Sequence, residues 1–123
     1  MANILIIDDS PTDVRVLATL MERAGHQVAA VSSAEEGLER VHVERPDLVI
    51  MDVIMPGMNG FQATRTLTRD PKTQDIPVVM ITTKSMETDR VWGMRQGARA
   101  FITKPVAEKE LLACINDLLP SAT

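Results

Sequence analysis

Five short apolar segments alternate along the chain with longer segments in which apolar positions recur every three or four residues. Aliphatic and β-branched residues dominate the short segments, which is typical of buried strands, and the spacing in the longer ones is typical of amphipathic helices. Such alternation predicts an α/β fold built on a parallel sheet. The predicted strands are Ile4 to Ile7, Gln27 to Val31, Leu48 to Met51, Val78 to Ile81 and Ala100 to Ile102.

The intervening segments begin and end with residues that start and stop helices. In the first of them Ser10 can cap a helix, Pro11 suits its first position, and Asp13 faces the free N–H groups of the first turn. Gly25 is expected to end this helix. Caps or stops of the other four helices are predicted at Ser33, Asn59, Asp70-Pro71, Ser85, Gly97 and Pro120.

Length and composition agree with one folded unit. The 123 residues are 45% hydrophobic and 24% charged, which suffices for a single core. Five strand–helix units occupy the whole chain, and no linker or low-complexity segment separates them. We therefore expect residues 1–123 to be one domain without an appended output domain.

Several protein classes are disfavoured by the same composition. The longest apolar runs are much shorter than the roughly 20 residues that cross a bilayer, and no secretory signal precedes the first strand. Cys114 is the only cysteine, so we expect it to be a packed side chain in a cytoplasmic protein. The net charge of −4, without a basic stripe, argues against nucleic-acid binding.

Polar residues directly follow four of the five predicted strands. In parallel α/β sheets ligands bind beyond the carboxyl ends of the strands, so these residues are candidates for one shared site. They are Asp8-Asp9, Asp52, Thr82-Thr83 and Thr103-Lys104-Pro105.

The chemistry of this set points to a cation and a phosphoryl group. Three carboxylates at one rim would repel one another unless a cation lay between them, and oxygen ligands without Cys or His favour Mg²⁺ over Zn²⁺. The cation, the Thr82 hydroxyl and the Lys104 ammonium could then each hold one oxygen of a transferring phosphoryl group. Asp52 is the best candidate nucleophile, because a carboxylate can form an acyl phosphate.

These residues lie in motifs that closely resemble the response-regulator receiver family over essentially the whole chain. The resemblance implies a doubly wound, flavodoxin-like (βα)5 fold with five parallel strands in the order 2-1-3-4-5. The matching motifs are Ile6-Ile7-Asp8-Asp9-Ser10, Ile50 to Gly60, Ile81-Thr82 and Thr103-Lys104-Pro105.

The resemblance also implies roles for individual residues. Asp8, Asp9 and Asp52 are expected to bind Mg²⁺ together with the backbone carbonyl of Ile54, and Asp52 is expected to accept the phosphoryl group. Thr82 and Lys104 correspond to the family's switch hydroxyl and ammonium, and a cis peptide bond is expected at Lys104-Pro105. Phe101 occupies the family's aromatic switch position.

Two sites depart from the commonest pattern of the family. Thr83 stands where a smaller residue is usual, and its β-branch is expected to narrow access to Asp52. Ile54 and Lys84 stand where the family tunes the lifetime of the phosphoryl group, and an apolar Ile54 offers an attacking water no hydrogen bond.

Two segments, residues 61–65 and 82–98, resemble receivers that control twitching motility by type IV pili. This implies a CheA-like histidine kinase as phosphoryl donor and a downstream protein of the pilus machinery, or a regulator of it, as partner. Trp92 is expected on the output surface, because its helical neighbours Thr88, Asp89, Arg95 and Gln96 are polar; the alternative is a residue at the edge of the core.

Other functions remain as alternatives. A flagellar chemotaxis-type CheY regulator or a phosphate sink would use the same residues, and an unphosphorylated protein-binding pseudo-receiver would signal by contacts alone. A phosphatase of the haloacid-dehalogenase type is disfavoured, because strand 1 is not followed by its D-x-D motif. We expect a phosphoacceptor whose only catalysis is its own phosphotransfer and dephosphorylation, not an enzyme.

Overall fold

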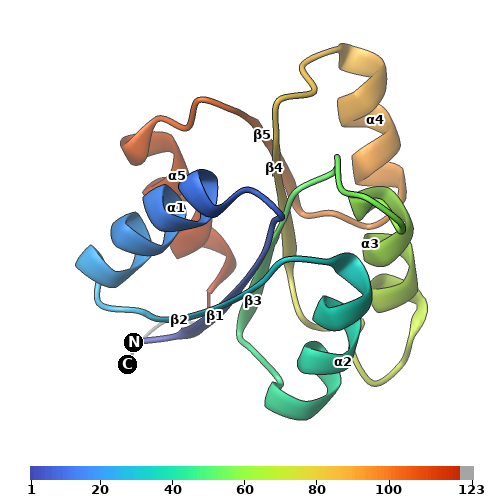
Figure 1. Ribbon diagram of the computed structural model, residues 1–123, viewed down its shortest axis with the longest axis horizontal. Coiled ribbons are helices and arrows are strands. Elements are labelled where there is room, and N and C mark those ends of the chain that lie inside the picture. Colours follow the sequence, from blue (N-terminus) through green and yellow to red (C-terminus); the bar gives the residue numbers. More distant parts are fainter. Residues whose placement is uncertain (120–123) are drawn as a thin grey trace.

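The aliphatic segments form one parallel sheet of five strands in the computed structural model, which describes residues 1–119. The strand order is β2-β1-β3-β4-β5, which confirms the expected order (Figure 1). All residues of β3 and β4 are buried, because helices cover both faces of the sheet. The strands are β1 (Asn3–Ile7), β2 (Gln27–Val31), β3 (Leu48–Met51), β4 (Val78–Thr82) and β5 (Ala100–Thr103).

Five helices pack on the sheet in two layers, with α1 and α5 on one face and α2, α3 and α4 on the other (Figure 1). Alternate residues of β1 serve the two layers: Ile4 and Ile6 pack with the α1 and α5 side chains, and Leu5 and Ile7 with those of α2 and α3. The helices are α1 (Pro11–Arg23), α2 (Ala34–Glu44), α3 (Gly60–Arg69), α4 (Glu87–Arg95) and α5 (Glu108–Leu118).

The predicted helix starts are confirmed for the first three helices. The hydroxyl groups of Ser10 and Ser33 accept backbone hydrogen bonds at α1 and α2, and Asn59 forms a reciprocal capping box with Gln62 at α3. Gly25 and Gly97 follow α1 and α4 with positive φ angles, as their predicted roles as stops require.

The predicted start of α4 at Ser85 is wrong. The helix begins at Glu87, and its N-cap is Met86, which makes no side-chain hydrogen bond. The Met86 carbonyl accepts the first bonds, from the N–H groups of Asp89 and Arg90, so Ser85 lies one residue too early to cap them. The predicted stop of the fifth helix at Pro120 lies outside the described residues.

Parallel pairing places the ends of β1 and β3 side by side. Ile7 and Met51 are partners in the register, so Asp8 and Asp52 both leave the sheet at the same rim. The Asp52 N–H donates to the Ile7 carbonyl at 2.9 Å, and the Lys104 N–H donates to the Thr82 carbonyl at 2.7 Å. Across residues 1–119, no helix has both the length and the apolar character that crossing a membrane requires.

Candidate functional site

Three carboxylates meet at the carboxyl ends of β1 and β3, as the strand-end pattern predicts. One oxygen from each of Asp8, Asp9 and Asp52 lies within 4.8 Å of the other two; we call these residues the acid cluster. Asp8 and Asp52 are buried, whereas Asp9 is exposed. Burial raises the pKa of the Asp8 carboxyl, and the charge of Asp52 raises it further.

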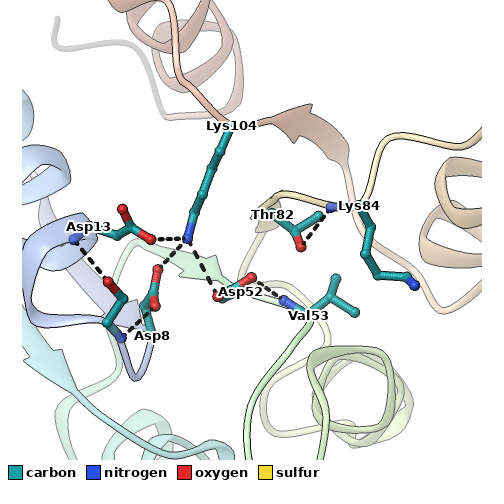
Figure 2. A network of polar contacts seen from close by, with 8 residues as sticks. Asp8, Asp13, Asp52, Val53, Thr82, Lys84 and Lys104 are labelled. Atoms are coloured by element: carbon teal, nitrogen blue, oxygen red, sulfur yellow. Dashed lines mark hydrogen bonds and ion pairs between the residues drawn. The ribbon is translucent and has the colours of Figure 1, made fainter.

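Local backbone groups orient the two buried carboxylates. Asp8 Oδ1 accepts a hydrogen bond from the Ser10 N–H at 2.9 Å, and Asp52 Oδ1 accepts one from the Val53 N–H at 2.7 Å (Figure 2). In each residue the other oxygen, Oδ2, is turned toward Lys104. The backbone bonds therefore keep both carboxylates pointing into the site, despite the repulsion between them.

Lys104 brings the positive charge that the strand-end pattern predicts, from the end of β5. Its Nζ donates to Asp13 at 2.7 Å, to Asp8 at 2.9 Å and to Asp52 at 3.4 Å (Figure 2). Burial lowers the pKa of this ammonium, but the hydrogen bonds to Asp13 and Asp8 and the charges of Asp52 and Asp8 outweigh burial and raise it above its usual range. Lys104 therefore stays protonated at neutral pH.

Asp13 is a member of the site that the sequence did not reveal. It was assigned only to the first turn of α1, yet its carboxylate is the nearest partner of the Lys104 ammonium. Its hydrogen bond to Lys104 lowers the pKa of the Asp13 carboxyl. No local sequence pattern predicts this contact, because the two residues are 91 positions apart in the chain.

Thr82 lies at the rim but makes no direct contact with the carboxylates. Its buried hydroxyl accepts a hydrogen bond from the Lys84 N–H at 3.3 Å, and the Lys84 side chain turns away to pair with Asp89. Thr83 and the side chain of Ile54 are exposed. The cis peptide bond expected at Lys104-Pro105 is confirmed.

The two predicted output residues have opposite environments. Phe101 is 8% exposed and packs with Val53, Met80 and Ala98 between α4 and the sheet. Trp92, on α4, is 47% exposed and belongs to none of the core clusters of the described residues. Trp92 therefore meets the first requirement of a contact residue, an accessible ring.

Cys114 packs partly buried against the core shared by α1 and α5, as predicted.

The acid cluster suits a hard divalent cation. It offers only carboxylate oxygens, with neither Cys nor His in the set, and Lys104 supplies one positive charge against the carboxylates of Asp8, Asp52 and Asp13. A single ammonium leaves a negative excess at the rim. The site therefore suits a hard divalent cation such as Mg²⁺.

Comparison with known proteins agrees with this geometry. The family model described as response regulator receiver domain matches residues 4–116. The chain belongs to this family. Receiver domains bind Mg²⁺ at an acidic aspartate cluster, act with a histidine kinase and a downstream target, and are signalling proteins rather than members of a classical enzyme family.

Individual relatives differ in how much of their length the receiver domain accounts for. Protein PilH of Pseudomonas aeruginosa is 54% identical over 119 residues, which cover 97% of this chain and 98% of PilH. Response regulator PleD of Caulobacter vibrioides is 37% identical over 95% of this chain but only 26% of PleD. The structure of the Vibrio cholerae chemotaxis protein CheY4 superposes with a TM-score of 0.89 at 28% identity and covers 97% of this chain and 99% of that one.

Proposed function

We propose that this receiver domain is a stand-alone response regulator in which Asp52 accepts a phosphoryl group from a histidine kinase. The observation that carries the proposal is the position of Asp52: its buried carboxylate lies within 4.8 Å of the other acids of the cluster and 3.4 Å from the Lys104 ammonium. The 54% identity with PilH, over 97% of this chain and 98% of PilH, supports a regulator of that kind.

Mg²⁺ would be held by the carboxylates of Asp8, Asp9 and Asp52 and by the backbone carbonyl of Ile54. When bound, it neutralises charge on the carboxylates and on the phosphoryl oxygens. The residues of the chain do the rest. Asp8 and Asp9 would hold the cation, and Asp52 would help to hold it and would also present the attacking oxygen.

The transfer is a displacement at phosphorus. A carboxylate oxygen of Asp52 forms a bond to phosphorus while the bond from phosphorus to the kinase's histidine nitrogen breaks, and the electron pair stays on the imidazole. Lys104 remains an ammonium throughout and neutralises one phosphoryl oxygen. Because it already reaches Asp52, it needs little movement to do so.

Thr82 is the group that must rearrange. Its hydroxyl accepts a hydrogen bond from the Lys84 N–H and would turn to donate one to a phosphoryl oxygen. This hydrogen bond to a phosphoryl oxygen can form only when Asp52 is phosphorylated. Phosphorylation would therefore favour the arrangement of the loop after β4, and of α4, in which Thr82 makes the bond. The size of the shift equals the difference in contact energy between that arrangement and the unphosphorylated one. Phe101 lies under α4, so its packing would change together with the position of α4. The exposed Trp92 on α4 would then contact a partner protein differently in the phosphorylated state.

The pathway we propose is chemotaxis-like control of twitching motility by type IV pili. The support is the likeness of residues 61–65 and 82–98 to receivers of such systems and the 54% identity with PilH. The expected partners are a CheA-like kinase and a downstream pilus protein or regulator. A cytoplasmic location and the absence of nucleic-acid binding stay predictions.

The test is incubation with acetyl phosphate, and separately with a phosphorylated CheA-type kinase, with Mg²⁺ or with EDTA, followed by intact-mass measurement. We expect one phosphoryl adduct in Mg²⁺ that is absent from Asp52→Asn and present in Asp75→Asn, which changes an exposed carboxylate away from the rim. Lack of an adduct in the wild type would favour a pseudo-receiver and refute the proposal.

The output residue is tested separately. Trp92→Ala should weaken binding of the phosphorylated protein to its target while the extent of phosphorylation is unchanged. The reason is that, within residues 1–119, the Trp92 side chain makes no hydrogen bond to a site residue and belongs to no core cluster. Unchanged target affinity and unchanged pilus-dependent motility would remove Trp92 from the output surface. If the protein takes phosphoryl groups from the kinase but the phosphorylated form binds no pilus component, it acts as a phosphate sink.

A further inference from the structure

Lys104 has three carboxylate partners, and one of them differs from the other two. Asp8 and Asp52 belong to the acid cluster and so would also bind the cation, whereas Asp13 does not belong to it. Asp13 is also the nearest of the three, at 2.7 Å. Its side chain is 40% exposed, while that of Lys104 is only 11% exposed.

The position of Asp13 is set by the N-terminal cap of α1. The Asp13 N–H donates to the Ser10 hydroxyl at 3.3 Å, and the Ser10 N–H in turn donates to Asp8. The cap thus places the carboxylates of Asp8 and Asp13 on the same ammonium. An ammonium has three N–H donors, so the three carboxylates use all of them.

A cation in the acid cluster and the Lys104 ammonium compete for the same ligands. Both are positive, so they also repel each other, and the oxygens of Asp8 and Asp52 that face Lys104 belong to residues that the cation needs. The ammonium must give up part of its contact with Asp8 and Asp52 when the cation binds. Asp13 is the partner that it can keep.

We infer that Asp13 is a positioning residue, which holds the Lys104 ammonium at the site when a divalent cation occupies the acid cluster. This inference rests on the proposed function. Without Asp13, Lys104 depends on Asp8 and Asp52 alone and competes more strongly with the cation. The lowered pKa of the Asp13 carboxyl, caused by its hydrogen bond to Lys104, agrees with a close charged pair.

The experiment is a double-mutant cycle on Mg²⁺ affinity, measured by calorimetric titration of the unphosphorylated protein. Asp13→Asn keeps the shape of the side chain and should weaken Mg²⁺ binding about five-fold, the size expected when a charged contact of about 1 kcal/mol is lost. Lys104→Met removes the competitor and should tighten binding. In the Lys104→Met protein, Asp13→Asn should change the affinity less than about two-fold.

The cycle separates this role from a simpler one. Equal weakening by Asp13→Asn with and without Lys104 would show that Asp13 attracts the cation directly, and it would overturn the inference, as would an unchanged affinity. Glu22→Gln, which removes an exposed carboxylate near the other end of α1, is the matched control and should change nothing. Thermal unfolding of each variant establishes that it is folded.

A spectroscopic readout tests the position of Lys104 itself. In the wild type with saturating Mg²⁺, NMR of the lysine side chains should show a Lys104 ammonium protected from exchange with solvent, and Asp13→Asn should abolish this protection. Persistence of the protected signal would overturn the inference. None of these measurements requires phosphorylation, so the inference can fail while phosphorylation of Asp52 stands, and the converse is equally visible.

Discussion

Asp9 is the member of the acid cluster whose replacement gives the clearest result. Across residues 1–119 its carboxylate makes no hydrogen bond and no ion pair, whereas Asp8 and Asp52 both contact Lys104. Asp9→Asn therefore removes repulsion and breaks no favourable contact of the metal-free protein. We expect this variant to be more stable than the wild type when metal is absent.

The size of the effect follows from the separation of the carboxylates. Two unit charges 4.8 Å apart repel by about 0.9 kcal/mol at a dielectric constant of about 80 and by about 3.5 kcal/mol at about 20. Asp9 is exposed, so the lower value applies to each of its two neighbours. Part of the Asp8–Asp9 repulsion persists in the unfolded chain, because the two residues are adjacent. The expected gain is therefore about 1 kcal/mol, or about 4 °C for a chain of this length.

The assay is thermal unfolding in EDTA and in Mg²⁺, with Glu22→Gln as a control. Asp9→Asn should unfold at the higher temperature in EDTA. In Mg²⁺ at about 100 times its dissociation constant, the wild type should gain about 2.7 kcal/mol, while the variant, which has lost a ligand, gains much less. The order of stability then reverses. A variant less stable than the wild type in EDTA, or equally stabilised by Mg²⁺, would refute the reasoning.

Two further predictions concern the surroundings of the site and the opposite end of the sheet. Gly60→Ala would place the new Cβ against the Asp52 carbonyl oxygen, a backbone atom that cannot move aside. We therefore expect the free energy of unfolding, measured in urea, to fall by about 3 kcal/mol or more, and phosphorylation to be slower. A fall of less than about 1 kcal/mol would contradict this prediction. Both ring nitrogens of His42 face acceptors, the Leu38 carbonyl and the Asp70 carboxylate, each at 2.9 Å, and these bonds raise the pKa of His42. Its contribution to stability should thus be complete below its ordinary pKa of about 6.5 and should disappear as the pH rises through the raised value; if His42→Gln leaves the pH dependence of unfolding between about pH 5.5 and 8.5 unchanged, this role is wrong.

Most of the fold was predictable because its signals are local. All five predicted strands overlap the observed ones, and Gln27–Val31 and Leu48–Met51 agree at both ends. A buried strand shows itself by composition and a helix by period and caps, both within a few neighbouring residues. Ser85 failed for the same reason: it is a good capping residue, but the loop after Thr82 carries the chain past it before α4 begins.

The candidate site was predictable in membership but not in its contacts. Asp8, Asp52 and Lys104 directly follow strands and Thr82 is the last residue of β4, and the carboxyl ends of parallel strands meet at one rim whatever the details of packing. Asp13 does not follow a strand, so the search for polar residues at strand ends did not select it. Its place in the first turn of α1 also concealed it, because an acidic residue there already has an ordinary explanation, its interaction with the helix dipole.

The sequence by itself determined which elements form and which strand-end residues reach the rim, and it predicted the charge and chemistry of a phosphoacceptor site there. Only the tertiary structure decided which of these groups touch. In the structure Lys104 binds Asp13 as well as Asp8 and Asp52. The Thr82 hydroxyl accepts a hydrogen bond from a backbone N–H, and Trp92 is exposed. The physical reason is range: element signals act over a few residues, whereas these contacts join segments up to 96 residues apart and depend on how the helices pack on the sheet.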